Sequence, residues 1–263
     1  MLWWCVALEK PWSWEWAPYP GVWIATLIPI GAYSWAVRRG PQPVDQRRFV
    51  YFLFGMIAFW VASDWPLGVL GAGYMASAHM TQFLLYTLVC APLLLLGTPE
   101  WMARGLPARM RRSVVWLGRS PLVAAIIYNV ILLATHAPGT VEVLRRSQLG
   151  SFAMDIAWVV AGFVLWLPVI SPLPEGRLGP MWGRMLYLFG ATALVAVIPA
   201  SMLTFSTTPV YAIYELAPRV FGLTAREDQQ IAGILMKLAT IPIVWGTIGV
   251  LWYRWNREEA VRA

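Results

Sequence analysis

The chain has 263 residues, of which 59% are hydrophobic and 13% are charged, and its formal net charge is +7. Apolar runs of about 20 residues recur along it, so the composition excludes an ordinary soluble domain. The positive charge is explained by membrane topology and by anionic lipid, and nucleic-acid binding is not expected.

Seven apolar segments are long enough to cross a hydrocarbon core of about 30 Å as helices. They are continuously apolar, whereas the strands of a membrane barrel alternate between apolar and polar residues. The sequence therefore predicts an all-α fold, a polytopic membrane protein built as a seven-helix transmembrane bundle. The segments are 20–37, 49–63, 75–96, 121–136, 152–170, 185–205 and 230–252.

The distribution of Lys and Arg predicts the orientation of this bundle, because basic loops stay in the cytoplasm. One side receives 14 of these residues and the other receives 5, with Lys237 inside the last span. We therefore expect the N-terminus outside and the C-terminus in the cytoplasm. The whole chain, 1–263, is expected to be one integral membrane domain. It divides into an interfacial N-terminal segment (1–19) rich in Trp, the bundle (20–253) and a cytoplasmic tail (254–263).

Polar and sulfur-containing side chains recur at the outer ends of the predicted spans. Ionisable groups at membrane depth are costly and are by default candidates for function. Imidazoles and thioethers together suit copper, above all Cu(I). The candidate metal ligands are His79, His136, Met75, Met80 and Met202.

A second set of polar residues predicts an ion-pair cluster that needs no metal. Lys237 lies about two turns into the last span and must reach the interface or find an anion. Asp155 and Asp64 are its expected partners, and a nearby ammonium would oppose cation binding. The members of this cluster are Asp64, Asp155, Lys237, Asp228 and Gln229.

An enzyme is not expected, since the sequence has no P-loop, dinucleotide fingerprint, HExxH or GxSxG pattern. Transport through Asp155 and Lys237 is a minor alternative, because no inverted repeat is visible.

Five segments, in order, resemble the CtaG-type cytochrome c oxidase assembly factors. The DQQ element at residues 228–230, followed by Ala-Gly and a hydrophobic-Met pair, is the most specific part. The segments are SAHMTQFLLYTLVCAPLLLLGTP at 77–99, THAP at 135–138, AGFVLWLPVI at 161–170, MLTFSTTPVYAIY at 202–214 and LTAREDQQIAGILMK at 223–237.

The resemblance implies a bacterial inner-membrane protein of seven helices that helps copper reach a haem–copper oxidase near the outer face. It also implies a third-span motif His-Met-x-Gln-His, of which His79, Met80 and Gln82 are present while Phe83 replaces the second histidine. Near Asp155 the family commonly carries further histidines, and position 237 is usually apolar or aromatic.

These departures leave two main hypotheses open. The first is an oxidase assembly factor that handles copper, with haem–copper oxidase subunits as its partners. The second is a metal-free structural or accessory subunit of a larger membrane complex, with no cofactor.

Overall fold

The computed structural model describes residues 2–8 and 10–262, and this part of the chain contains helices and connecting segments but no strand. Pro20 at the start of the first helix and Pro121 at the start of another occupy first-turn positions, where proline leaves no hydrogen bond unmade. The helices are α1 (Pro20–Arg39), α2 (Gln46–Ser63), α3 (Leu67–Gly73), α4 (Ala76–Leu84), η1 (Leu85–Cys90), α5 (Ala91–Gly97), α6 (Glu100–Arg104), α7 (Ala108–Arg119), α8 (Pro121–His136), α9 (Pro138–Leu144), α10 (Gln148–Ile170), η2 (Pro174–Gly176), α11 (Met181–Ala193), α12 (Val197–Phe205), α13 (Ala212–Glu215), α14 (Ala225–Leu238) and α15 (Thr240–Arg262).

Within the described residues, five helical segments are long and apolar enough to cross a membrane. Two further pairs of helices pass the same test together, but α2 and α3 bend by 47° at their junction, and α7 and α8 bend by 99°. The number of spans is therefore five, or up to seven if each bent pair is one span. The all-helical multi-pass fold is confirmed, and the count of seven stays a prediction.

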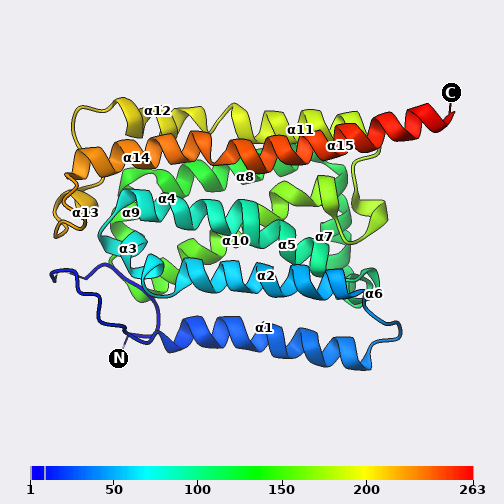
Figure 1. Cartoon of the computed structure of the whole chain (residues 1–263), viewed down its shortest axis with the longest axis horizontal. Helices are drawn as coiled ribbons and strands as arrows, with labels where there is room; N and C mark the ends of the chain where they lie inside the picture. The colour runs from blue at the N-terminus through cyan, green and yellow to red at the C-terminus, as the bar shows by residue number, and fades with distance from the viewer. Residues whose placement is uncertain (1, 9, 263) are drawn as a thin grey trace.

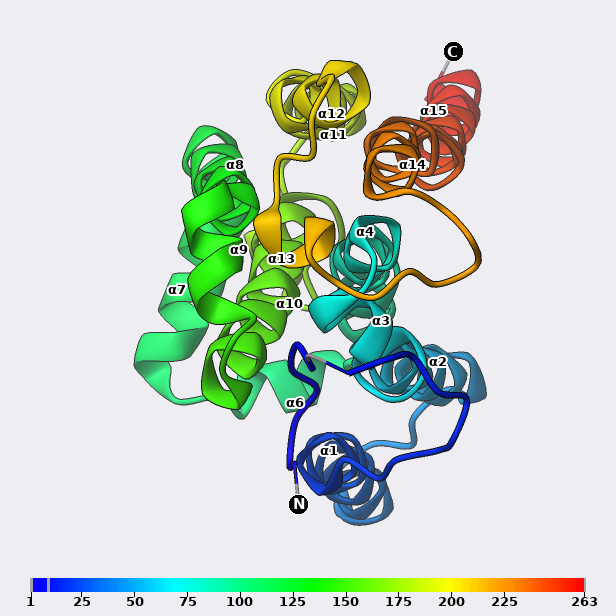
Figure 2. The same ribbon diagram turned by 90° about the vertical axis from the view of Figure 1, so that its left-hand side faces the viewer.

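The continuous rod α4–η1–α5 and the long helix α10 form the centre of the bundle, as the end-on view shows (Figure 2). They pack against each other and against α2 and α8, so most of their side chains are buried. Helix α1 and the α14–α15 rod lie at the periphery, with large apolar side chains such as Trp23, Ile28 and Trp245 exposed. In a bilayer those side chains face lipid.

The two ends of the bundle differ in composition (Figure 1). One end holds α3, α9, α13 and the start of α4, whereas the other holds α6, the basic helix α7 and the C-terminal end of α15. Most Arg residues belong to the second end, as the sequence count predicts. Which end faces the cytoplasm stays a prediction.

The segment before α1 folds over the first end of the bundle. Trp14 and Trp16 are more than half exposed, whereas Trp4 and Cys5 are buried, and the interfacial location of the segment stays a prediction. The Gln148 side chain accepts a hydrogen bond from the Trp3 amide. This segment is therefore part of the packed structure around the polar residues described next.

Candidate functional site

The two histidines of the chain meet at the first end of the bundle. His79 lies in the first turns of α4, His136 is the last residue of α8, and each side chain is 1% exposed. Their ring centroids are 5.8 Å apart. The order of the spans predicts that both lie at the same end of the bundle, although they are 57 positions apart in sequence.

Hydrogen bonds fix which nitrogen of each imidazole carries the proton. His136 Nδ1 lies 2.8 Å from the Leu132 carbonyl oxygen, which can only accept, so Nδ1 is the donor. The Tyr214 hydroxyl donates its single proton to the Gly71 carbonyl, so it accepts from His79 Nδ1 at 2.8 Å. Both rings therefore have their Nδ1 position occupied.

The Nε2 atoms of both rings are buried and have no hydrogen-bond partner among the described residues. A proton on either Nε2 would have no acceptor there, so each ring presents a lone pair. An imidazole nitrogen binds zinc at about 2.0–2.1 Å, which puts the centroids of two rings sharing one metal about 5–6.5 Å apart. The observed separation of 5.8 Å fits one shared metal ion.

The start of α4 is held in place by α14. The Asp228 carboxylate accepts hydrogen bonds from the Ala76 amide at 2.6 Å, the Ser77 amide at 3.3 Å and the Ser77 hydroxyl. These amides are unsatisfied donors at a helix N-terminus, where a carboxylate is also favoured by the helix dipole. Asp228 thus fixes the turn that precedes His79.

Gln229 and two tyrosines organise the chain that runs over the histidines. The Gln229 side chain accepts from the Val210 amide at 2.6 Å and donates to the Leu203 carbonyl at 3.3 Å. The Tyr211 hydroxyl donates to the His136 carbonyl at 2.8 Å. The DQQ element and the YAIY segment therefore act together, one positioning the backbone and the other contacting both histidines.

Aromatic rings enclose the imidazoles. Trp158 is edge-on to His79, with centroids 4.9 Å apart, and is stacked with His136 at 5.9 Å. Phe83, at the position where the resemblance implies a histidine, lies edge-on to His136 at 4.8 Å. These rings exclude water from the space around the two lone pairs.

The predicted Lys237–Asp155 pair is wrong. Lys237 is exposed on the outer side of α14 and forms no ion pair within residues 2–8 and 10–262. Asp155 instead faces Arg145, whose Nη1 is 3.1 Å from Asp155 Oδ1, and both side chains are buried. The Trp4 indole donates to the other carboxylate oxygen at 2.9 Å. The physical reason is the helix face on which Lys237 lies. It shares that face with exposed Ile234 and not with buried Met236, so its side chain points away from the bundle.

The remaining sequence candidates fall at different places. Met75 and Met80 are buried in the same turn region of α4 as His79, whereas Met202 is 39% exposed on α12 and is removed from the buried pair. Asp64 is buried at the α2–α3 junction, with no hydrogen-bond partner for its carboxylate oxygens among the described residues. The polar cluster of the sequence analysis is thus several separate contacts rather than one.

Four residues of the centre were missed: Arg145, Trp158, Tyr211 and Tyr214. Arg145 was counted with the outer loops, and a basic residue on the side poor in basic residues is the signal that could have identified it. The described residues contain no group of three or more His, Cys, Asp or Glu side chains suited to a metal. Any metal here would depend on the two imidazoles and on ligands of other kinds.

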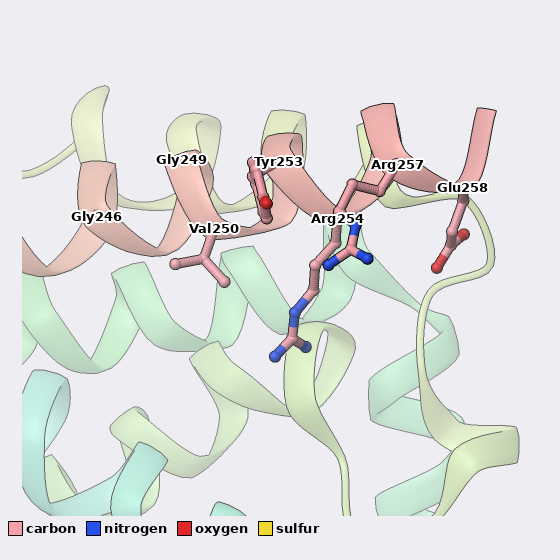
Figure 3. Close-up of a pocket in the computed structure, with 7 residues that line it drawn as sticks. All are labelled: Gly246, Gly249, Val250, Tyr253, Arg254, Arg257 and Glu258. Atoms are coloured by element: carbon pink, nitrogen blue, oxygen red, sulfur yellow. The ribbon is translucent and has the colours of Figure 1, made fainter. Parts of the chain in front are cut away.

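A surface groove on α15 is a second place where a ligand could bind. A groove of about 840 Å³ runs along α15, where Gly246 and Gly249 leave space and Arg254 and Arg257 project beside Glu258 (Figure 3). It is lined by residues 246–258 of α15, whereas the histidines lie in the first turns of α4 and at the end of α8. The candidate site is therefore the enclosed histidine centre.

Comparison with known proteins identifies the family. No curated protein and no solved structure matches the chain. The model of the cytochrome c oxidase caa3 assembly factor family matches residues 31–258, which includes both histidines, Arg145, Asp155 and the DQQ element. The chain belongs to the cytochrome c oxidase caa3 assembly factor family.

Proposed function

We propose that this protein assists the assembly of a haem–copper oxidase by carrying copper, as cargo, between the imidazoles of His79 and His136. The observation that supports this role is the pair of buried Nε2 lone pairs without a protein partner. Their Nδ1 atoms are already hydrogen-bonded, and a partner on the other ring nitrogen is what orients metal-binding histidines.

The ligand set favours Cu(I) over other metals. Structural zinc takes four ligands, commonly Cys and His, and the described residues offer no such group. Imidazoles and thioethers suit Cu(I), and two buried methionines lie close to His79 in sequence: Met75 immediately before α4 and Met80 within it. The role is non-catalytic, since the residues bind and release an ion and transform no substrate.

The site lies at the end of the bundle that is poor in basic residues. The positive-inside rule assigns that end to the outside of a bacterial inner membrane. A copper carrier acting there would deliver its ion to an oxidase from the outer face.

The test is retention of Cu(I) by the purified full chain. Wild-type protein loaded anaerobically and freed of excess ion is expected to hold about one copper per chain. His79→Ala and His136→Ala should each lose it in competition with a Cu(I) chelator. Met202→Leu is the matched control, because this methionine is exposed and should not affect retention.

A metal-free accessory subunit is the second candidate, supported by the contact between Phe83 and His136. A phenyl ring supplies no ligand where the family resemblance implies an imidazole. If wild-type protein retains no Cu(I) but copurifies with oxidase subunits in gentle detergent, the copper proposal is overturned and this role is supported.

A further inference from the structure

Arg145 is a fully buried arginine whose donors are not all used. It is 0% exposed, follows α9, and its carbonyl accepts a hydrogen bond from the Ala7 amide. Nη1 faces Asp155 at 3.1 Å, and Nη2 donates to Gln82 Oε1 at 3.4 Å. Nε and Nη1 have no hydrogen-bond partner among the described residues, so Nη1 meets Asp155 as an ion pair only and Nε meets no acceptor at all. A buried donor left unpaired costs about 1–3 kcal/mol, and more on a charged group.

The guanidinium and the two imidazoles belong to the same buried centre. Arg145 lies over the Trp158 ring, 5.1 Å from its centroid, and both histidines contact that ring as well. Gln82, which accepts from Arg145, is three residues after His79 on α4 and so lies on the same helix face. An unpaired donor and two unpaired lone pairs are thus gathered around one indole.

The charges of this centre balance before any ion enters. Arg145 is neutralised by Asp155, and the two histidines are neutral tautomers. A bound Cu(I) would add one uncompensated positive charge in apolar surroundings, and an unpaired buried charge is strongly unfavourable. One monovalent anion would cancel that charge and would also accept the Arg145 Nε–H.

We propose that the centre binds Cu(I) together with one small monovalent anion of the halide class, which is the third ligand of copper and accepts a hydrogen bond from Arg145. This inference rests on the proposed function, because the anion is held by the copper and the guanidinium together. Halides are soft enough to accompany Cu(I) with imidazole ligands. No bond is broken and no electron is transferred when the anion binds.

The experiment is X-ray absorption at the copper edge on full-length protein loaded with Cu(I) in chloride, in bromide or in sulfate buffer. We expect imidazole nitrogens in every buffer, with a chlorine neighbour in the first and a bromine neighbour in the second. Chelator competition should show copper binding at least about ten-fold weaker in sulfate, the scale on which outer-shell partners act.

Variants assign the anion to Arg145. The double variant Arg145→Met/Asp155→Leu removes both charges, so no buried charge is left unpaired. It should keep the imidazole nitrogens and lose bromine. Arg146→Met is the matched control, because Arg146 is exposed and pairs with Glu142 at the surface, and it should keep bromine.

The outcomes separate the two proposals. Copper bound with nitrogen and no bromine in wild-type protein overturns the anion and leaves the copper role intact. No copper in any buffer overturns the copper role itself. Bromine retained in the double variant overturns the assignment to Arg145, and if that variant does not fold, the wild-type comparison of bromide with chloride still decides whether the anion binds.

Discussion

Tyr214 and His79 share a hydrogen bond that determines which nitrogen of the imidazole carries the proton. The tyrosine hydroxyl gives its proton to the Gly71 carbonyl at 2.7 Å, so it receives the Nδ1 proton of His79 at 2.8 Å. Tyr214 comes from the short helix α13, Gly71 from α3 and His79 from α4. A tyrosine from a distant part of the sequence, together with the neighbouring helices α3 and α4, therefore determines which nitrogen of His79 is available.

Tyr214→Phe should weaken Cu(I) binding by about 10–100-fold, because it removes the partner that orients His79. The affinity is measured by competition with a Cu(I) chelator, and the thermal midpoint shows whether the fold is kept. Tyr253→Phe, a change on the exposed side of α15, is the control and should bind copper as the wild type does. Equal affinity in the two variants would contradict the orienting role of Tyr214.

Asp228→Ala should destabilise the protein by about 1–3 kcal/mol, since it leaves the Ala76 and Ser77 amides without their buried acceptor. The measurement is the free energy of unfolding in detergent. Asp228→Asn keeps an acceptor oxygen, so its free energy of unfolding should lie between those of the wild type and Asp228→Ala. Glu258→Gln, at an exposed position near the C-terminal end, is the control. A loss no larger than that of this control would show that α4 does not depend on α14 for its N-terminal cap.

The sequence was sufficient to predict the helical fold and a common end of the bundle for the two histidines, because hydropathy gives span limits and span order gives the end at which each residue lies. It was also sufficient, in principle, to orient Lys237. Positions 229, 232, 233 and 236 of α14 are buried and recur at helical spacing, and Lys237 falls with the exposed Ile234 instead. The Lys237–Asp155 pair was predicted from the depth of the two residues in the membrane, without considering which face of its helix Lys237 occupies.

Arg145 could not be placed in the same way. It lies beyond the apolar periodicity, and it contacts Ala7 of the N-terminal segment, Gln82 of α4 and Asp155, to which the Trp4 indole donates. Contacts of this kind join irregular segments far apart in the chain, and no periodic pattern encodes them.

Lys237→Leu and Arg145→Leu should differ in their effect on the stability of the fold. The first replaces an exposed cation without an ion pair in the described structure, and it should leave stability unchanged or raise it in a bilayer. The second leaves Asp155 buried and unpaired, which should cost about 3–5 kcal/mol. Unfolding of both variants in lipid nanodiscs is the comparison, and a large loss in Lys237→Leu would restore that residue as a structural partner.

The reactivity of the Cys5 thiol tests whether the N-terminal segment is packed against the bundle. Burial holds the pKa of this thiol well above its ordinary value of 9.0, so the folded protein keeps the less reactive protonated form while an unfolded chain ionises above about pH 9. Its contribution to stability is therefore full below that pH and is lost as the pH rises further.

In a Cys90→Ala background, alkylation of Cys5 should stay slow up to about pH 9 and become fast on unfolding. Trp4→Phe, which removes the indole donor to Asp155, should speed labelling by loosening the segment. Rapid labelling of the parent protein at neutral pH would show that the segment does not cover its end of the bundle.

Phe83→His should place a third imidazole against His136, because the phenyl ring it replaces lies 4.8 Å from that histidine, centroid to centroid. The unloaded variant should be less stable, since a polar ring enters a packed aromatic site. Its Cu(I) affinity should rise by at least about ten-fold, and the new nitrogen should displace the halide, so that bromide buffer gives copper with nitrogen neighbours alone.

Phe59→His is the matched control for that variant. Phe59 is also buried and packs against Trp4 and Tyr86 rather than against either histidine. It should carry a similar stability cost without any gain in copper affinity. If both variants gain equally, the added imidazole acts through a nonspecific site; if neither gains, the two existing imidazoles and position 83 do not converge on one ion.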